Sequence, residues 1–159
     1  MRLILFGVCV IMYDESVCKM GVVSMHERVL GANLPSVAAL AYLGDAAHSL
    51  YVRRMLVARG ISKSGELNRL ALSYVTCEEQ AKAARIIEEY LLDDEREVFR
   101  RAQNSAHLNK PKRAKIADYR AATALEAVLG MLTWLEDGER ISYLLAIAYE
   151  GSHTEPDGE

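Results

Sequence analysis

The sequence predicts an all-α protein with one compact domain. Three prolines and ten glycines in 159 residues leave long segments without a helix breaker. Apolar residues recur at helical spacing along most of the chain, whereas the alternating pattern of a half-buried strand is almost absent. Hydrophobic residues make up 51% and charged residues 26% of the chain, an ordinary balance for a globular protein that buries a single core.

The first 25 residues differ from the rest. Leu3–Met12 is an apolar run that is short for a membrane span and about as long as the apolar segment of a secretory signal. No clear small-residue cleavage site follows it. We therefore expect residues 1–25 to be an over-extended start or a poorly ordered leader, rather than a signal or an anchor. Residues 26–150 would form the domain, and residues 151–159 a tail too polar to pack.

Capping signals divide the domain into helices. Asn33 is a candidate N-cap, Pro35 suits a first turn, and Gly60 ends the helix that they begin. Thr76 and Glu79 have the spacing of a capping box. The helices predicted in this way cover residues 35–59, 64–75, 76–91, 118–132 and 139–149.

The stretch Ala39–Arg54 carries one acid, Asp45, inside an apolar helical pattern and directly after Gly44. An ionised carboxylate in an apolar setting costs several kcal/mol unless it is paired, hydrogen-bonded or bound to a metal. A glycine inside a helix costs about 1 kcal/mol relative to alanine, so Gly44 indicates a close approach of another part of the chain. The residues predicted to face the core lie three to five positions apart: Leu40, Leu43, Ala47, Leu50 and Met55.

Glu126 repeats this pattern in Asp118–Leu132, where apolar residues surround it and Gly130 follows. If the two helices pack together, their acids converge, and a hard divalent cation between them would relieve the repulsion. Mg²⁺ is typically held by one or two carboxylates plus waters and a substrate phosphate. Each acid alone would equally suit a solvated helix face or a salt bridge. His48 is left out of this site because Mg²⁺ prefers oxygen to imidazole.

Charge is distributed unevenly along the chain. Residues 96–120 contain eight basic residues and two acids, a net charge of +6, whereas the whole chain carries −3. A local basic segment of this kind is typical of a surface that binds phosphate backbones, although a merely soluble loop has the same composition. Five acids precede it, and we interpret them as solvated helix ends with an N-cap from Asp93 or Asp94: Glu88, Glu89, Asp93, Asp94 and Glu95.

These motifs resemble a known enzyme family. LGD at residues 43–45 and LEAVLG at residues 125–130 resemble the signature of ribonuclease III catalytic domains. More closely, ALAYLGDA, YVR, a basic loop and YRAATALEAVLGML follow one another as in Mini-ribonuclease III, the short bacterial form without a double-stranded-RNA-binding domain. Full ribonuclease III has two further acids, at positions held here by Ala41 and Thr123. The short form departs at the same positions.

The resemblance implies a ribonuclease III-like helical bundle that cleaves double-stranded RNA with Mg²⁺, or with Mn²⁺ as a substitute. Asp45 and Glu126 would be the catalytic, metal-holding pair, supported by Gly44, Tyr119 and Thr123. The expected partners are precursor 23S ribosomal RNA and a second copy of the chain, which would pair through the LGD helix. Six basic residues would contact the RNA: Arg101, Lys110, Lys112, Arg113, Lys115 and Arg120.

Two other functions remain open on the sequence. A non-catalytic RNA-binding or ribosome-associated module of the same fold is conceivable, because two acids stand where full ribonuclease III has four. A helical scaffold whose basic loop binds an acidic protein would leave both acids unexplained. The three cysteines lack a paired motif, so we expect neither a disulfide framework nor a zinc site, and we expect a cytoplasmic location without a membrane segment.

Overall fold

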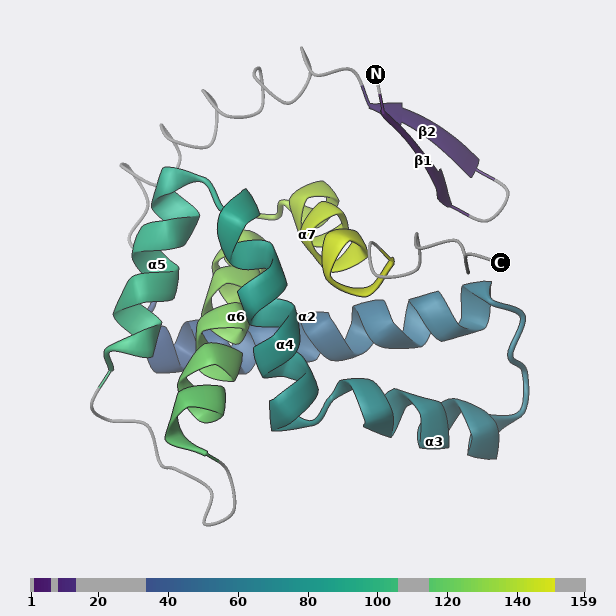
Figure 1. The fold of residues 1–159 in the computed structure, drawn as a ribbon, viewed down its shortest axis with the longest axis horizontal. Coiled ribbons are helices and arrows are strands. Elements are labelled where there is room, and N and C mark those ends of the chain that lie inside the picture. The colour runs from purple at the N-terminus through teal and green to yellow at the C-terminus, as the bar shows by residue number, and fades with distance from the viewer. Residues whose placement is uncertain (1, 7–8, 14–33, 106–114, 151–159) are drawn as a thin grey trace, which may run out of the picture.

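The computed structural model of the protein describes residues 2–6, 9–13, 34–105 and 115–150. From residue 34 onward every described element is helical, so the prediction of an all-α domain is confirmed (Figure 1). In chain order the elements are β1 (Arg2–Phe6), β2 (Cys9–Tyr13), α2 (Val37–Ala58), α3 (Ser64–Tyr74), α4 (Cys77–Ile87), the 3₁₀-helix η1 (Glu88–Tyr90), α5 (Asp93–Gln103), α6 (Ile116–Trp134) and α7 (Gly138–Glu150).

The apolar run near the start of the chain forms a β-hairpin, which the sequence pattern did not predict. β1 and β2 pair antiparallel, with Arg2 opposite Tyr13 and Phe6 opposite Cys9. A continuous apolar run has no period that would separate a strand from a helix, and this explains the omission. The remaining expectations for the leader and for the tail at 151–159 fall outside the described residues.

Local capping explains where α2 and α4 begin. The Ser36 hydroxyl accepts a hydrogen bond from the Ala39 amide at 3.3 Å, so Ser36 caps α2 and the predicted cap, Asn33, is wrong. Gly60 has φ +82°, a conformation that favours glycine, and it follows the end of α2 as predicted. Thr76 caps α4 as predicted, by accepting from the Glu79 amide at 3.3 Å.

The acidic segment that ends in the first turn of α5 was predicted to be solvated, and for Glu95 this is wrong. Glu95 is fully buried, and its carboxylate accepts two hydrogen bonds of 2.8 Å from the guanidinium of Arg140 on α7. The same carboxylate accepts from the Leu92 amide at 2.9 Å, so Glu95 caps α5 and neither Asp93 nor Asp94 does. The pattern of acids in the sequence could not single out Glu95, because its partner lies 45 residues away.

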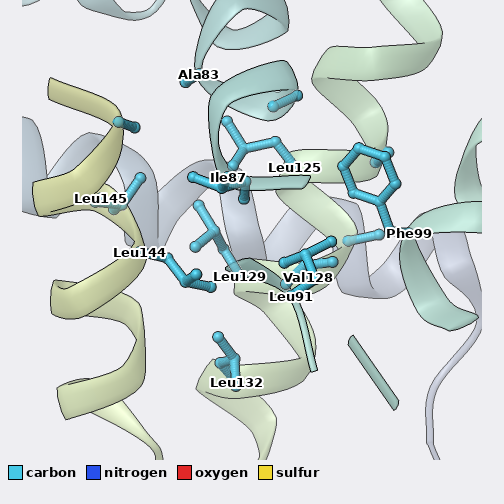
Figure 2. Close-up of a cluster of buried hydrophobic side chains, with 14 of the residues drawn as sticks. Ala83, Ile87, Leu91, Phe99, Leu125, Val128, Leu129, Leu132, Leu144 and Leu145 are labelled. Atoms are coloured by element: carbon cyan, nitrogen blue, oxygen red, sulfur yellow. The ribbon is translucent and has the colours of Figure 1, made fainter. Parts of the chain in front are cut away.

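α6 is the central helix, and α2, α4, α5 and α7 pack against it (Figure 1). From residue 121 to residue 132 every α6 residue except Glu126 is buried. A helix that is apolar on all sides lies in the interior, which explains the central position of α6. Figure 2 shows the apolar cluster to which α6 and the helices packed against it, α4, α5 and α7, contribute. Its labelled residues include Ile87, Phe99, Leu125, Val128, Leu129, Leu132, Leu144 and Leu145.

The long helix α2 crosses behind this bundle, and its C-terminal half extends beyond it beside α3 (Figure 1). α3 has no fully buried residue. Within the described residues, no helix combines the length and the apolar character that crossing a lipid bilayer requires.

Candidate active site

Two glycines allow α2 and α6 to touch backbone to backbone. A Cβ atom added to Gly44 would lie 1.7 Å from the carbonyl oxygen of Glu126, and one added to Gly130 would lie 1.8 Å from that of Leu40. Along each helix the two contacts are one turn apart. The prediction that Gly44 permits a close approach is confirmed, and the approaching backbone belongs to Glu126 itself.

This crossing brings the two predicted acids together. Asp45 directly follows Gly44 on α2, and Glu126 faces Gly44 from α6. Burial, and then the negative charge of Asp45, raise the pKa of Glu126 from 4.5 to about 7. Neither carboxylate forms an ion pair with a lysine or arginine among the described residues. The two acids therefore form a coupled pair that a cation would relieve.

The surroundings of Asp45 differ from the prediction. Asp45 is exposed, and Leu50, predicted to face the core, is 58% exposed. The real buried stripe of α2 runs along Leu40, Ala41, Gly44, His48, Val52, Met55 and Leu56. Leu40 and Met55 of the predicted set are buried, Leu43 and Ala47 are half-buried, and only Leu50 is exposed. The prediction was wrong in part because α2 carries apolar residues on two faces. Asp45 thus lies at the edge of the helix crossing, accessible from outside, and Glu126 lies deeper.

A third polar residue at the crossing, Gln80 on α4, was not predicted. Its side chain is 4% exposed, and its amide lies close enough to Glu126 to oppose the rise in the pKa of that carboxyl. The two groups do not meet with full hydrogen-bond geometry, and the amide nitrogen Nε2 has no hydrogen-bond partner in the described part of the chain. In the sequence CEEQAKAA, Gln80 resembles any exposed helix residue, so no local signal marked it.

His48 is buried one turn after Asp45. Its Nε2 and the Tyr149 hydroxyl lie 2.6 Å apart, and Nδ1 has no partner among the described residues. Burial lowers the pKa of His48 to about 4 despite the opposing charge of Asp45, so the ring is neutral at pH 7.

The chemistry of the donors fits a hard divalent cation. Among the described residues, no three or more His, Cys, Asp and Glu side chains converge as a metal-binding group. A soft or strongly coordinated metal such as zinc needs a set of that size. Mg²⁺ needs only one or two carboxylates, because it keeps several waters, and Asp45 with Glu126 supplies that number.

Of the supporting residues, Thr123 is 3% exposed and Tyr119 is half-buried. Both lie on α6 before Glu126. Ala41 is also buried, so the two positions at which full ribonuclease III would carry further acids are filled by small, buried residues. The site is therefore limited to two carboxylates at these four positions.

The predicted RNA-binding residues fall into two groups. Arg101 near the end of α5, Lys115 before α6 and Arg120 in α6 are all exposed. The end of α5 and the start of α6 lie on the same side of the molecule (Figure 1). Lys110, Lys112 and Arg113, which complete the predicted set, lie outside the described residues. Of the three described residues, Arg120 lies on the helix that also carries Glu126, Lys115 precedes that helix, and Arg101 lies on α5.

Comparison with known proteins identifies the class to which this fold and paired-acid site belong. Residues 38–137 match the model of the ribonuclease III domain, and the chain belongs to the ribonuclease III family. It is an endoribonuclease, as the sequence resemblance predicted.

Individual relatives narrow the similarity to one group of that family. Mini-ribonuclease 3 from Streptococcus pneumoniae is 36% identical over 120 residues, covering 74% of this chain and 94% of that protein. Mini-ribonuclease 3 from Brevibacillus brevis is 37% identical over 124 residues, covering 78% and 92%. A crystal structure of a protein from Fusobacterium nucleatum superimposes with a TM-score of 0.66 at 28% identity, over 76% of this chain and 96% of that one. The predicted resemblance to Mini-ribonuclease III is confirmed.

Proposed function

We propose that this endoribonuclease cleaves double-stranded RNA with Mg²⁺ held by Asp45 and Glu126. The observation that carries the proposal is the glycine-mediated crossing of α2 and α6, which brings the two acids close enough for the charge of Asp45 to raise the pKa of Glu126.

The two acids have different roles in the proposed reaction. When bound, Mg²⁺ would polarise a phosphate oxygen and lower the pKa of a water. Asp45, which is exposed, would hold the ion on the side open to substrate, and Glu126 would hold it from the interior. Because the pKa of Glu126 is about 7, its proton must leave before the carboxylate can serve as a ligand.

The basic side of the bundle would bind the RNA backbone. Arg101, Lys115 and Arg120 are exposed and have no ion-pair partner among the described residues. Recognition of double-stranded RNA depends mainly on shape, phosphates and 2′-hydroxyls, which basic side chains on a helical surface can contact. Lys110, Lys112 and Arg113 would extend this surface. The choice of precursor 23S ribosomal RNA as natural substrate, and of the cytoplasm as location, rests on the resemblance to the short group and on the unpaired cysteine pattern.

A homodimer through α2 accounts for the second apolar face of that helix. Tyr42, Leu50 and Val57 are 80%, 58% and 59% exposed, and their spacing of eight and seven residues places them on one face. Leu72 on the adjacent α3 is 66% exposed. Monomers rarely leave large apolar patches in water, so a second copy of the chain is the proposed cover of these side chains. Each copy would then cut one strand of the duplex.

Cleavage of an end-labelled double-stranded stem from precursor 23S ribosomal RNA tests the proposal. The unchanged protein should cut both strands with Mg²⁺ or Mn²⁺, and neither EDTA-treated protein nor the Asp45→Asn variant should cut. Asp93→Asn, which makes the same chemical change at an exposed residue of α5, is the matched control and should retain activity.

Other results would point elsewhere. Robust cleavage by Asp45→Asn would remove the metal-site assignment. Tight, metal-independent binding without cutting would support the RNA-binding module instead, for which the only structural argument is that Ala41 and Thr123 are not acids. Equal cutting of an unrelated duplex would leave the enzyme intact but remove the preference for the ribosomal stem.

A further inference from the structure

Gln80 is a buried amide in a place where packing alone does not call for one. It lies on the face of α4 that packs against α6, beside Ala81, Ala83 and Ala84, all of which are buried. An apolar side chain of the same length would fill this space without removing an amide from water. Buried polar side chains nearly always have a hydrogen-bond partner, yet Nε2 of Gln80 has none in the described residues.

The Glu126 carboxylate on α6, the helix against which α4 packs, lies close enough to this amide for the two groups to interact. The amide acts on the Glu126 carboxyl in the direction that favours its ionised form, as a hydrogen-bond donor near a carboxylate does. Asp45 acts on the same carboxyl in the opposite direction. Glu126 is therefore under two opposing influences. The donor on α4 favours its ionised form, and the like charge on α2 disfavours that form. A cation bound by both acids would remove this conflict.

We propose that Gln80 is a positioning residue of the metal site, donating from Nε2 to one oxygen of Glu126 so that the other oxygen faces Asp45. This inference rests on the proposed function, because it assumes that the two carboxylates hold a divalent cation. The amide and the carboxylate lie just outside hydrogen-bond geometry as described. A cation attracting Glu126 would fix the carboxylate in one orientation. The Gln80 amide would then donate a hydrogen bond to the carboxylate oxygen that faces away from Asp45.

Partners of this kind behind a metal-binding carboxylate tune the affinity of the site. Replacing such a residue typically weakens metal binding by about ten- to a hundredfold without removing any ligand. Gln80→Met keeps the length and volume of the side chain and removes only the amide. We therefore expect this variant to fold normally and to bind Mn²⁺ about ten- to a hundredfold more weakly than the unchanged protein.

Mn²⁺ binding to the full chain without RNA, followed by electron paramagnetic resonance, measures this effect apart from activity. The decisive comparison is a double-mutant cycle with Glu126→Gln. If Gln80 acts through the Glu126 carboxylate, Gln80→Met has no further effect once that carboxylate is gone. Gln103→Met, the same change on α5, is the matched control and should bind Mn²⁺ like the unchanged protein.

The outcomes separate this inference from the proposed function. Unchanged Mn²⁺ affinity in Gln80→Met, or the same loss in the Glu126→Gln background, would overturn the positioning role while leaving cleavage of double-stranded RNA untouched. Absence of Mn²⁺ binding by the unchanged protein would overturn both. Should Gln80→Met fail to fold, Gln80→Asn replaces it: the shorter amide cannot reach Glu126, and full Mn²⁺ affinity in that variant would contradict the inference.

Discussion

Glu126→Gln should make the protein more stable at pH 8 while abolishing its activity. The structure sets Glu126 beside Asp45 and partly removes it from water, so its ionised form is costly. Glutamine has nearly the same shape and no charge. The variant therefore keeps the packing of α6 and removes the repulsion, which is the reverse of what most substitutions in a helical core do.

The magnitude follows from the pKa. A rise from 4.5 to about 7 corresponds to about 3 kcal/mol at 1.36 kcal/mol per pKa unit. Glu126 is only partly buried, so solvent screening reduces this, and we expect a gain in the free energy of unfolding of about 1–3 kcal/mol.

The sign depends on pH. Because the pKa of Glu126 is higher in the folded state, the folded state holds the proton more tightly between pH 4.5 and 7. The free energy of unfolding therefore falls as the pH rises through this window, and the full cost is present above pH 7. Glu126→Gln should match the unchanged protein at pH 4 and exceed it at pH 8.

His48 titrates in an overlapping window with the opposite sign. Its pKa falls from 6.5 to about 4 on folding, so its contribution to stability is complete above pH 6.5 and is lost as the pH falls toward 4. Both proteins contain His48, and its effect cancels in their difference.

Urea denaturation in EDTA, at pH values from 4 to 8, measures that difference. Adding Mg²⁺ should then stabilise the unchanged protein more than the variant, because the variant keeps only one of the two carboxylates and binds the ion more weakly. A variant that is less stable at pH 8, or a difference that does not change with pH, would refute the reasoning.

Three further predictions concern the crossing, the RNA surface and the buried ion pair. Gly44→Ala should lower the free energy of unfolding by about 3 kcal/mol or more, because the added methyl group meets a backbone carbonyl that cannot move aside. Gly65→Ala is the control and should not lower it, because nothing lies within 4 Å of the added methyl group. Equal stabilities of the two variants in urea would contradict the close crossing. Alanine at Lys112 and Arg113 should lower the slope of log affinity against log salt by about 0.9 for each phosphate that the variant no longer neutralises, and an unchanged slope would place the RNA elsewhere. Arg140→Met should cost about 3–5 kcal/mol in urea by leaving its buried carboxylate partner unpaired, whereas a loss below 1 kcal/mol would mean that water reaches that carboxylate.

The glycine-mediated crossing links stability to function in this domain. A looser approach of α2 and α6 would separate the two carboxylates and relieve their repulsion. The chain instead places glycines at positions 44 and 130, where each glycine inside a helix costs about 1 kcal/mol relative to alanine. Strained or unfavourable arrangements of this kind collect at functional sites.

The sequence by itself determined the fold class, the boundaries of most helices and the two acids. Helical periodicity and capping residues are local properties of the sequence, so they can be read without knowing which distant residues are in contact. The Gly44 contact was readable because a glycine inside a helix is locally unfavourable and indicates a close approach. Asp45 was expected in an apolar setting and is exposed.

Only the tertiary structure decided which face of α2 is buried, how Glu95 is used and that Gln80 is buried near Glu126. α2 has apolar residues on two faces, and the choice between them depends on where α6 lies. Glu95 and Gln80 are ordinary helix residues in sequence, and each is explained only by a partner more than forty residues away. Contacts between distant residues do not alter the periodicity of the sequence, because each partner fits the polar and apolar pattern of its own helix.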